Sequence, residues 1–344
     1  MRKLVILLAA LLLAVPVLAQ DVATTPEAMP ADSMMVEGTP MVAVSDQVSL
    51  DGTVVIDEIF SSGPGWIVIH IDNGGAPGPV AGMTHLAAGV NANVTVKLYG
   101  EGMADPTPTL FAMLHVDDGE AGVYEFGTVE GADGPVSVDG AVVTPSFAFS
   151  SIYGWDQFIG DDNMLTIASV TIGTPGFLVI HSGDPASFGP VLANVPLAAG
   201  TTNDVMVEVP AEGRTEVLWP MLHVDTGAAG VYEFGTVEGA DGPVVVGGDV
   251  ATTAIYTVPN MRVASQVVLH GDNAPEMMMM GDMMGTGVMA SSVLSEGPGF
   301  LVIHSDNGGS PGPVLGVAPV SDGLNRDVFV EISGDITPVV FPML

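Results

Sequence analysis

Residues Met113–Val136 read MLHVDDGEAGVYEFGTVEGADGPV, and residues Met221–Val244 read MLHVDTGAAGVYEFGTVEGADGPV. The two strings are identical at 22 of 24 positions. The two differences are Asp118 against Thr226 and Glu120 against Ala228. Strings of this length that recur within one chain indicate an array of like modules.

A second string occurs three times, as GPGWIVIHIDNGGAPGPV from Gly63, TPGFLVIHSGDPASFGPV from Thr174 and GPGFLVIHSDNGGSPGPV from Gly297. Successive copies begin 111 and then 123 residues apart. Such a period is too long for a solenoid repeat and typical of a β-sandwich domain. Each module also opens with a glutamine, at Gln47, Gln157 and Gln266. We therefore expect three modules, at residues 44–150, 151–258 and 259–344.

Short apolar stretches fill each module, and Gly, Pro and Asn-Gly turn signals separate them. In the first module we expect strands at Val48–Leu50, Thr53–Phe60, Trp66–Ile71, Val80–Leu86, Asn93–Leu98, Thr109–Val116 and Val136–Val143. Seven short strands and no helical periodicity predict an all-β chain of tandem immunoglobulin-like (Greek-key) β-sandwich modules. Ala121–Phe126 resembles the tyrosine-corner stretch of such sandwiches, and another sandwich topology stays open as the alternative.

The N-terminus predicts export. Arg2 and Lys3 precede an apolar run that ends in Val17-Leu18-Ala19, which is the pattern of a signal peptide. We expect residues 1–19 to be the signal peptide, 20–43 to be a flexible leader, and the protein to be secreted, extracellular or in the cell envelope. An uncleaved N-terminal anchor is the alternative. With the signal removed, no further membrane span is expected.

Charge and cysteine content restrict the function classes. The chain carries six basic and 40 acidic residues, a formal net charge of −34, so it repels nucleic acid and attracts cations. It has no cysteine, which excludes disulfides, thiolate metal sites and cysteine nucleophiles. We expect no nucleic-acid partner, and each module has to be stabilised by its own apolar core.

The third module differs from the others. A Met-rich stretch at 275–290 interrupts it, and the printed sequence ends at Leu344, where the earlier modules continue with HVD. Three interpretations remain open: a fragment of a longer gene, a shortened capping module, or a module completed by a strand from elsewhere. The last interpretation predicts self-assembly by β-strand addition at the third module.

Histidines recur in the pattern His-x-Asp, which places imidazole and carboxylate on one face of a strand. If the strands that carry His70 and His115 pack as neighbours, His70, Asp72, His115 and Asp117 could converge. Two histidines with carboxylates suit zinc, copper(II), nickel or iron(II). The alternative is a structural hydrogen bond from imidazole to carboxylate. The candidate metal ligands of this kind are His70, Asp72, His115, Asp117, His181, His223, Asp225, His304 and Asp306.

Two other groups of residues are candidate metal ligands. Thioethers are soft ligands that favour copper(I), and the Met-rich stretch supplies Met277, Met278, Met279, Met280, Met283 and Met284. Its alternative is an apolar packing loop. Oxygen-rich residues near Asp117, Asp118 and Asp133 suggest calcium, with a solvated acidic loop as the alternative. Apart from calcium or a transition metal, we expect no cofactor.

No Gly-x-Ser-x-Gly, Walker, Rossmann or His-Glu-x-x-His motif occurs, so we expect no enzyme activity and no catalytic residues. The two recurring strings resemble a family of secreted repeat modules of unknown function, found in surface proteins of halophilic archaea and exported proteins of some bacteria. The resemblance covers nearly all of 44–344 and implies a β-sandwich displayed outside the membrane. We therefore expect a structural, adhesive or interaction role at the cell surface, with an exported metal-binding protein as the alternative.

Overall fold

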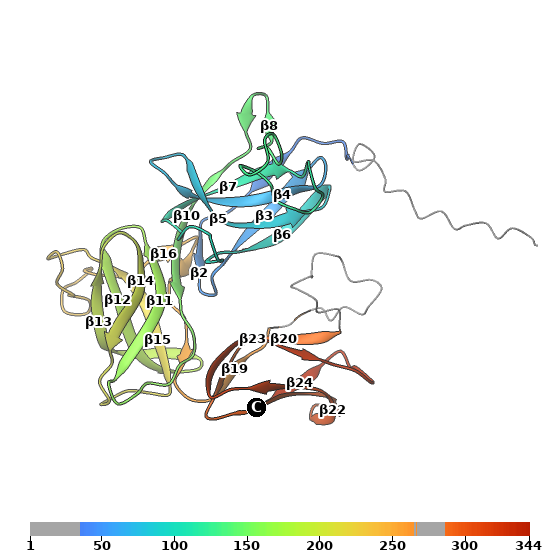
Figure 1. Cartoon of the computed structure of the whole chain (residues 1–344). Coiled ribbons are helices and arrows are strands. Elements are labelled where there is room, and N and C mark those ends of the chain that lie inside the picture. The colour runs from blue at the N-terminus through green and yellow to red at the C-terminus, as the bar shows by residue number, and fades with distance from the viewer. Residues whose placement is uncertain (1–34, 265, 267–285) are drawn as a thin grey trace, which may run out of the picture.

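The computed structural model describes residues 35–264, 266 and 286–344. These residues form antiparallel sheets joined by turns, with no helix among them (Figure 1). Within these ranges there is accordingly no helix long and apolar enough to cross a membrane. The prediction of an all-β chain of tandem β-sandwich modules is confirmed, whereas the finer immunoglobulin-like connectivity stays a prediction.

The first sandwich packs a three-stranded sheet on a four-stranded one. The first sheet has the order β1 (Met41–Ala43), β3 (Thr53–Ser61), β6 (Gly89–Lys97). The second has the order β5 (Pro77–Leu86), β4 (Gly65–Asp72), β7 (Thr109–Val116), β10 (Ser146–Tyr153). Alternate residues of both sheets point inward, so Ile56, Ile67 and Leu114 meet in one fully buried core. The short strand β2 (Gln47–Ser49) pairs in parallel with β10, and β8 (Ser137–Val138) pairs with β9 (Ala141–Val142).

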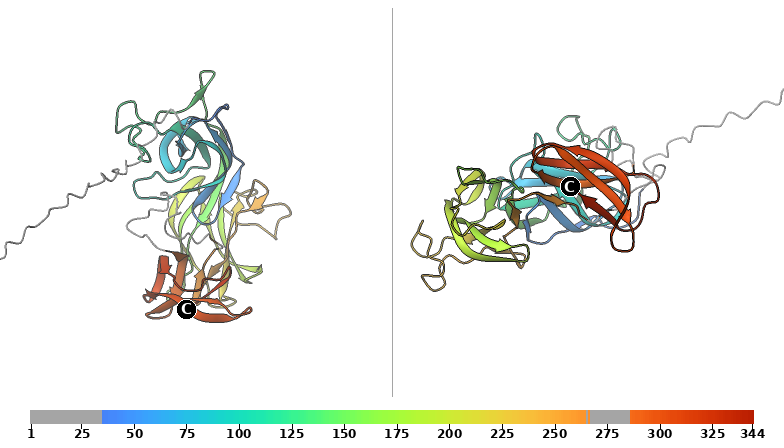
Figure 2. Two further views of the ribbon diagram at one scale, coloured as in Figure 1. Left: turned by 90° about the vertical axis from the view of Figure 1, so that its right-hand side faces the viewer. Right: turned by 90° about the horizontal axis from the view of Figure 1, so that it is seen from below.

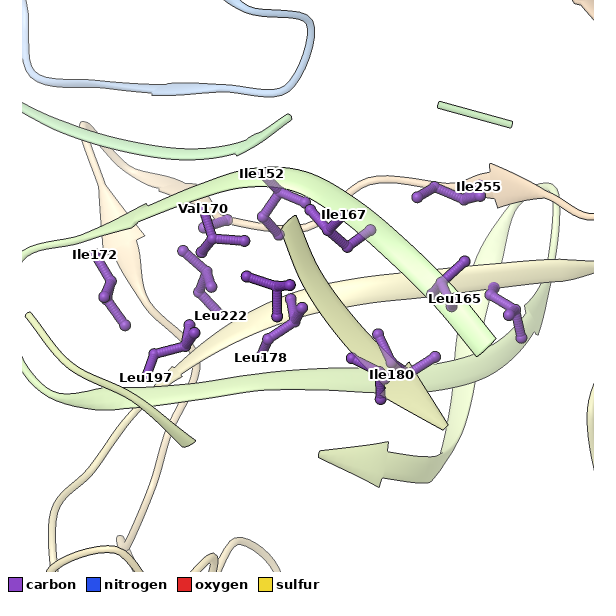
Figure 3. Packing of buried hydrophobic residues seen from close by; sticks show 14 of the residues in the cluster. Ile152, Leu165, Ile167, Val170, Ile172, Leu178, Ile180, Leu197, Leu222 and Ile255 are labelled. Carbon is purple, nitrogen blue, oxygen red and sulfur yellow. The ribbon is translucent and has the colours of Figure 1, made fainter. Parts of the chain in front are cut away.

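The second sandwich repeats this arrangement around its own core (Figure 3). The tail of β10, β11 (Met164–Ile172) and β14 (Gly200–Glu208) face β13 (Ser187–Leu197), β12 (Gly176–Asp184), β15 (Val217–Val224) and β18 (Ile255–Tyr256). A small hairpin joins β16 (Val245–Val246) to β17 (Asp249–Val250). The labelled isoleucine and leucine side chains in Figure 3 come from both sheets and fill the space between them.

The third unit has two three-stranded sheets. One has the order β19 (Asn260–Arg262), β20 (Gly287–Ser295), β23 (Gly323–Glu331), and the other β22 (Pro311–Val320), β21 (Gly299–Asp306), β24 (Val340–Met343). Its core is separate from the other two and includes Val293, Ile303 and Val330. Figure 2 shows the three units as distinct parts of the chain.

A single strand, β10, belongs to two sandwiches. Its first residues pair with β7 of the first sandwich, and its last residues pair with β11 of the second. Phe147 and Phe149 are buried in the first core, whereas Ile152, of opposite parity, is buried in the second. Because successive side chains of a strand point to opposite faces, one strand contributes to both cores. β10 crosses the expected boundary between residues 150 and 151 and was not expected as a strand.

The recurring glutamines have a common structural role. The Gln47 side chain accepts a hydrogen bond from the N–H of Val55 (2.8 Å) and donates one to the carbonyl of the same residue (3.0 Å). Gln157 does the same with Thr166, and Gln266 with Met289. A primary amide has both a donor and an acceptor, so it imitates a neighbouring strand at this point.

One local expectation is wrong. The segment expected as one strand at Val136–Val143 is the small hairpin β8–β9, because Asp139 and Gly140 adopt positive φ and turn the chain. The stretch Ala121–Phe126 is a loop without strand structure. In the Met-rich stretch, Gly287–Ala290 lie in β20, and the six candidate methionine ligands lie outside the described residues.

Candidate functional site

The repeated string that follows β7 folds over the outer face of its own sheet. We call Asp117–Val136 the first covering loop and Asp225–Val244 the second covering loop. The ring of His115 points away from the core and meets the ring of Phe126 at 5.0 Å between centroids. Trp66, from the neighbouring strand β4, meets Tyr124 at 5.5 Å. The loop therefore buries a second, smaller apolar layer on the outside of the sandwich.

Carboxylates hold the first covering loop in shape. Asp133 is completely buried, and its two oxygens accept hydrogen bonds from the N–H of Asp118 (3.0 Å) and of Glu125 (2.5 Å). Glu125 accepts the N–H of Glu120 (2.7 Å), and Asp117 accepts that of Gly122 (3.0 Å). A buried carboxylate is tolerated when such donors replace water. These acidic residues are therefore structural acceptors within the loop.

One glycine is required by this network. Gly119 adopts φ of +129°, and a Cβ at that position would collide with the Glu125 carboxylate. Gly227 has φ of +135° and would collide with Glu233 in the same way. A side chain at either position would meet both backbone strain and a steric clash.

The two differences between the strings leave the network intact. In the first loop, the Asp118 carboxylate accepts the N–H of Asp133 at 2.6 Å, and in the second the Thr226 hydroxyl accepts the N–H of Asp241 at 2.9 Å. At the other position only the backbone takes part, since the N–H of Ala228 donates to Glu233 as that of Glu120 donates to Glu125. The near-identity of the strings therefore follows from one demanding backbone conformation.

Each covering loop rests on one histidine, His115 or His223, and a second histidine from the neighbouring strand lies beside it. The rings of His70 on β4 and His115 on β7 lie 5.9 Å apart between centroids, with planes 20° apart. In the second sandwich, His181 and His223 also lie 5.9 Å apart, with planes 30° apart. We call these the first and second histidine pairs.

Every ring of the histidine pairs is bound to a backbone carbonyl. His70 Nδ1 lies 2.7 Å from the carbonyl oxygen of Gly78, and His115 Nδ1 lies 2.7 Å from that of Asp133. In the second pair, the partners are Gly189 (2.8 Å) and Asp241 (2.6 Å). Since a carbonyl oxygen only accepts, each Nδ1 carries a hydrogen and a neutral ring keeps its lone pair on Nε2. All four Nε2 atoms are buried and have no hydrogen-bond partner among the described residues.

Burial sets the ionisation of this layer. Desolvation lowers the pKa of His70, His115 and His223 below the usual value, outweighing the carbonyl hydrogen bonds that raise it. Desolvation also raises the pKa of Tyr124 and of Tyr232 to about 12, with a contribution from Asp133 or Asp241. His70, His115 and His223 are therefore neutral near pH 7.

The two sandwiches differ at one polar contact. His85 Nε2 lies 2.8 Å from Asp117 Oδ2 in the first. In the second, Pro196 occupies the equivalent register position opposite Phe177, and Asp225 Oδ1 is buried without a partner among the described residues. The first covering loop thus has an additional contact to β5.

The structure rearranges the predicted His-x-Asp groups. It brings histidines of neighbouring strands together and directs the carboxylates elsewhere: Asp72 and Asp306 accept the N–H groups of Gly75 and Gly309 in turns. The alternative of an imidazole held by its own carboxylate is wrong, because His304 also bonds to a carbonyl, that of Gly312 at 2.8 Å. The described residues contain no group of three or more His, Asp or Glu side chains suited to a metal ion.

The roles of several important residues were not predicted from the sequence. Tyr124, Phe126 and Asp133 have their roles only because the covering loop folds back, and His85 lies outside both recurring strings. The available signal was the invariance of the loop residues between two copies, which indicated a constraint without showing its nature.

Comparison with known proteins places these features in a family. The chain is 37% identical over 117 residues to Cell surface glycoprotein 2 and 36% identical over 117 residues to Cell surface glycoprotein 1, both of Haloarcula hispanica. Each match covers 33% of this chain and 12% of the relative, so the matched part is a small portion of those proteins.

A profile described as a domain of unknown function, DUF7282, matches residues 40–150 and again residues 151–257. Each matched range contains one sandwich with its histidine pair and covering loop. The two matches together span more than half of the chain, which therefore belongs to the DUF7282 family and carries two consecutive copies of its domain.

Proposed function

We propose that this chain is an exported, acidic, multi-module β-sandwich protein with a structural, adhesive or interaction role at the cell surface. The observation that carries the proposal is its 37% identity to a protein named as a cell surface glycoprotein. The signal-peptide pattern at residues 1–19 and the acidic composition support the same location. The proposal includes no enzyme activity.

The way the sandwiches are joined supports a structural role. Asp156, nearly fully buried, receives hydrogen bonds from Arg262 Nε (2.9 Å) and Nη2 (2.6 Å), and from the side chain of Asn260 (2.8 Å). Arg326 of the third unit lies 4.4 Å from the ring of Trp155. Together with the shared strand β10, these contacts resist bending between units, as expected of a spacer or coat element.

The location is tested on intact cells that produce the protein. Brief external protease treatment followed by mass spectrometry is expected to release peptides of this chain before those of a cytosolic marker. Peptides that appear only after lysis would contradict the surface location.

The interaction role is tested by light scattering coupled to size-exclusion chromatography. The chain from Gln20 onward is expected to associate as its concentration rises, with or without calcium. A strictly monomeric protein at every protein and calcium concentration would contradict assembly, including the strand addition expected at the third module.

A further inference from the structure

The two histidine pairs present four buried nitrogen lone pairs that the fold itself leaves unused. Both pairs have the same ring separation, 5.9 Å, in two sandwiches whose sequences elsewhere differ. Every Nε2 atom of the pairs is buried without a hydrogen-bond partner among the described residues. An unpartnered buried polar atom is costly, so its occurrence in both copies calls for a ligand.

The hydrogen bonds of the rings orient these lone pairs. The strands lie in the order β5, β4, β7, with residues 134–136 of the covering loop alongside β7. His70 Nδ1 faces Gly78 on β5, and His115 Nδ1 faces Asp133 on the opposite side of the pair. Because the two nitrogens of an imidazole point in nearly opposite directions, each Nε2 atom lies on the side of its ring away from the carbonyl bound by Nδ1, within a pair of rings whose centroids are 5.9 Å apart.

The surroundings select the chemistry of the ligand. Asp72, Asp117 and Asp133 are engaged by backbone N–H groups, and no other carboxylate joins the pair to form a three-ligand group in the described ranges. Two neutral nitrogens in a buried layer do not compensate a divalent charge. They do suit a soft monovalent ion, and Met113 occupies the intervening register position on the same face of β7.

We propose that each histidine pair binds one soft monovalent cation of the copper(I) and silver(I) class between its two Nε2 atoms. The Nδ1–H bonds to backbone carbonyls would then fix each ring, as they do for histidine ligands in general. Met221, almost fully buried between His181 and His223 in register, supplies the equivalent thioether in the second sandwich. The covering loop closes the site from solvent.

The third unit provides a matched comparison within the chain. His304 makes the same carbonyl bond as His70 and His181, but its Nε2 is not among the buried unpartnered atoms. Among the residues of the third unit that the structure describes, no second histidine accompanies it, and His270 lies outside them. A single imidazole is expected to bind silver(I) far more weakly than a pair.

The test is nitrogen-15 NMR of the histidine rings in the chain from Gln20 onward, titrated with silver(I) until the spectra stop changing. The Nε2 signals of His70, His115, His181 and His223 are expected to shift, with Nδ1–H retained and saturation at one silver(I) per pair. Binding to methionines elsewhere leaves these ring signals in place, so the readout separates the two kinds of site.

The matched variants are His115→Phe and His304→Gln. The first is expected to abolish the shift at His70 while His181 and His223, in the same molecule, still respond and report an intact second sandwich. The second is expected to change nothing at the pairs. The proposal is overturned if the Nε2 signals of the histidine pairs do not shift at saturating silver(I). It is also overturned if the His304 signal shifts at the same silver(I) concentrations as the signals of the pairs.

Discussion

The second and third units carry the same recurring string on one strand of the outer sheet face, but this face is buried in the second unit and exposed in the third. Phe177 and Phe300 occupy the same place in the recurring string, yet Phe177 is 1% exposed and Phe300 is 59% exposed. Phe177 lies beneath the second covering loop, where its ring meets Tyr232 at 5.2 Å. Over Phe300, the described part of the third unit has no such loop. The comparison teaches that the loop, and not the strand sequence, buries this face.

The largest expected effect comes from removing the covered ring. Phe177→Ala is expected to lower the free energy of unfolding of the second sandwich by about 3–5 kcal/mol, because it leaves a cavity under the loop. The matched Phe300→Ala is expected to change the stability of the third unit by less than about 0.5 kcal/mol. Hydrogen exchange resolved by unit measures both, and equal losses would contradict the comparison.

The next effect comes from the buried carboxylate of the loop. Asp133→Ala is expected to destabilise the first sandwich by about 3 kcal/mol, since two backbone N–H groups lose a charged acceptor. The loop amides should then exchange quickly with solvent while β3 and β6 stay protected. Glu120→Ala, which copies Ala228, is the control and should leave exchange unchanged.

Acid is expected to weaken the covered faces. His115 faces His70, Tyr124 and Asp133, and burial holds its pKa below 6.5, so on acidification the unfolded state binds protons first. The stability contribution is complete above pH 6.5 and decreases as the pH falls below that value. Chemical denaturation followed by NMR, in chelator-treated buffer, measures the decrease.

A second-sandwich variant sharpens the acid prediction. His223→Gln should flatten the pH dependence of the second sandwich and leave that of the first unchanged. If the amides of the first covering loop stay protected from hydrogen exchange at pH 5, the neutral histidines do not stabilise the covered face as described.

The smallest expected effect comes from swapping the residues that differ between the two covering loops. Asp118→Thr and Thr226→Asp should each change stability by less than about 0.5 kcal/mol, because either side chain accepts the N–H of the buried aspartate. Asp118→Val has a similar shape to Thr but no acceptor, and it should cost more than Asp118→Thr. If denaturant unfolding shows equal losses of stability for Asp118→Val and Asp118→Thr, the side chain at position 118 does not act as a hydrogen-bond acceptor that stabilises the loop.

Much of the fold was predictable from particular residues. Alternation in Thr53–Phe60 and the apolar run Trp66–Ile71 indicated strands that the structure contains as β3 and β4. β10 was not predictable, because Phe149 and Ile152 point to different cores and so break a simple alternating pattern. In the candidate site, the expected convergence of His70 and His115 from neighbouring strands is found, whereas the Asp72 and Asp117 carboxylates bond to other groups.

The sequence by itself determined the all-β class, the repetition, the acidic balance and the residues on which the loops depend, because these follow from composition, period and recurrence. Only the tertiary structure decided that Asp133 turns inward to accept its own loop's N–H groups, and that the Asp72 carboxylate accepts an N–H in a turn instead of joining His70 and His115. Such contacts depend on how a loop folds back over a sheet and on which strands become neighbours. Those are properties of long-range packing, which the spacing of residues along the chain does not encode.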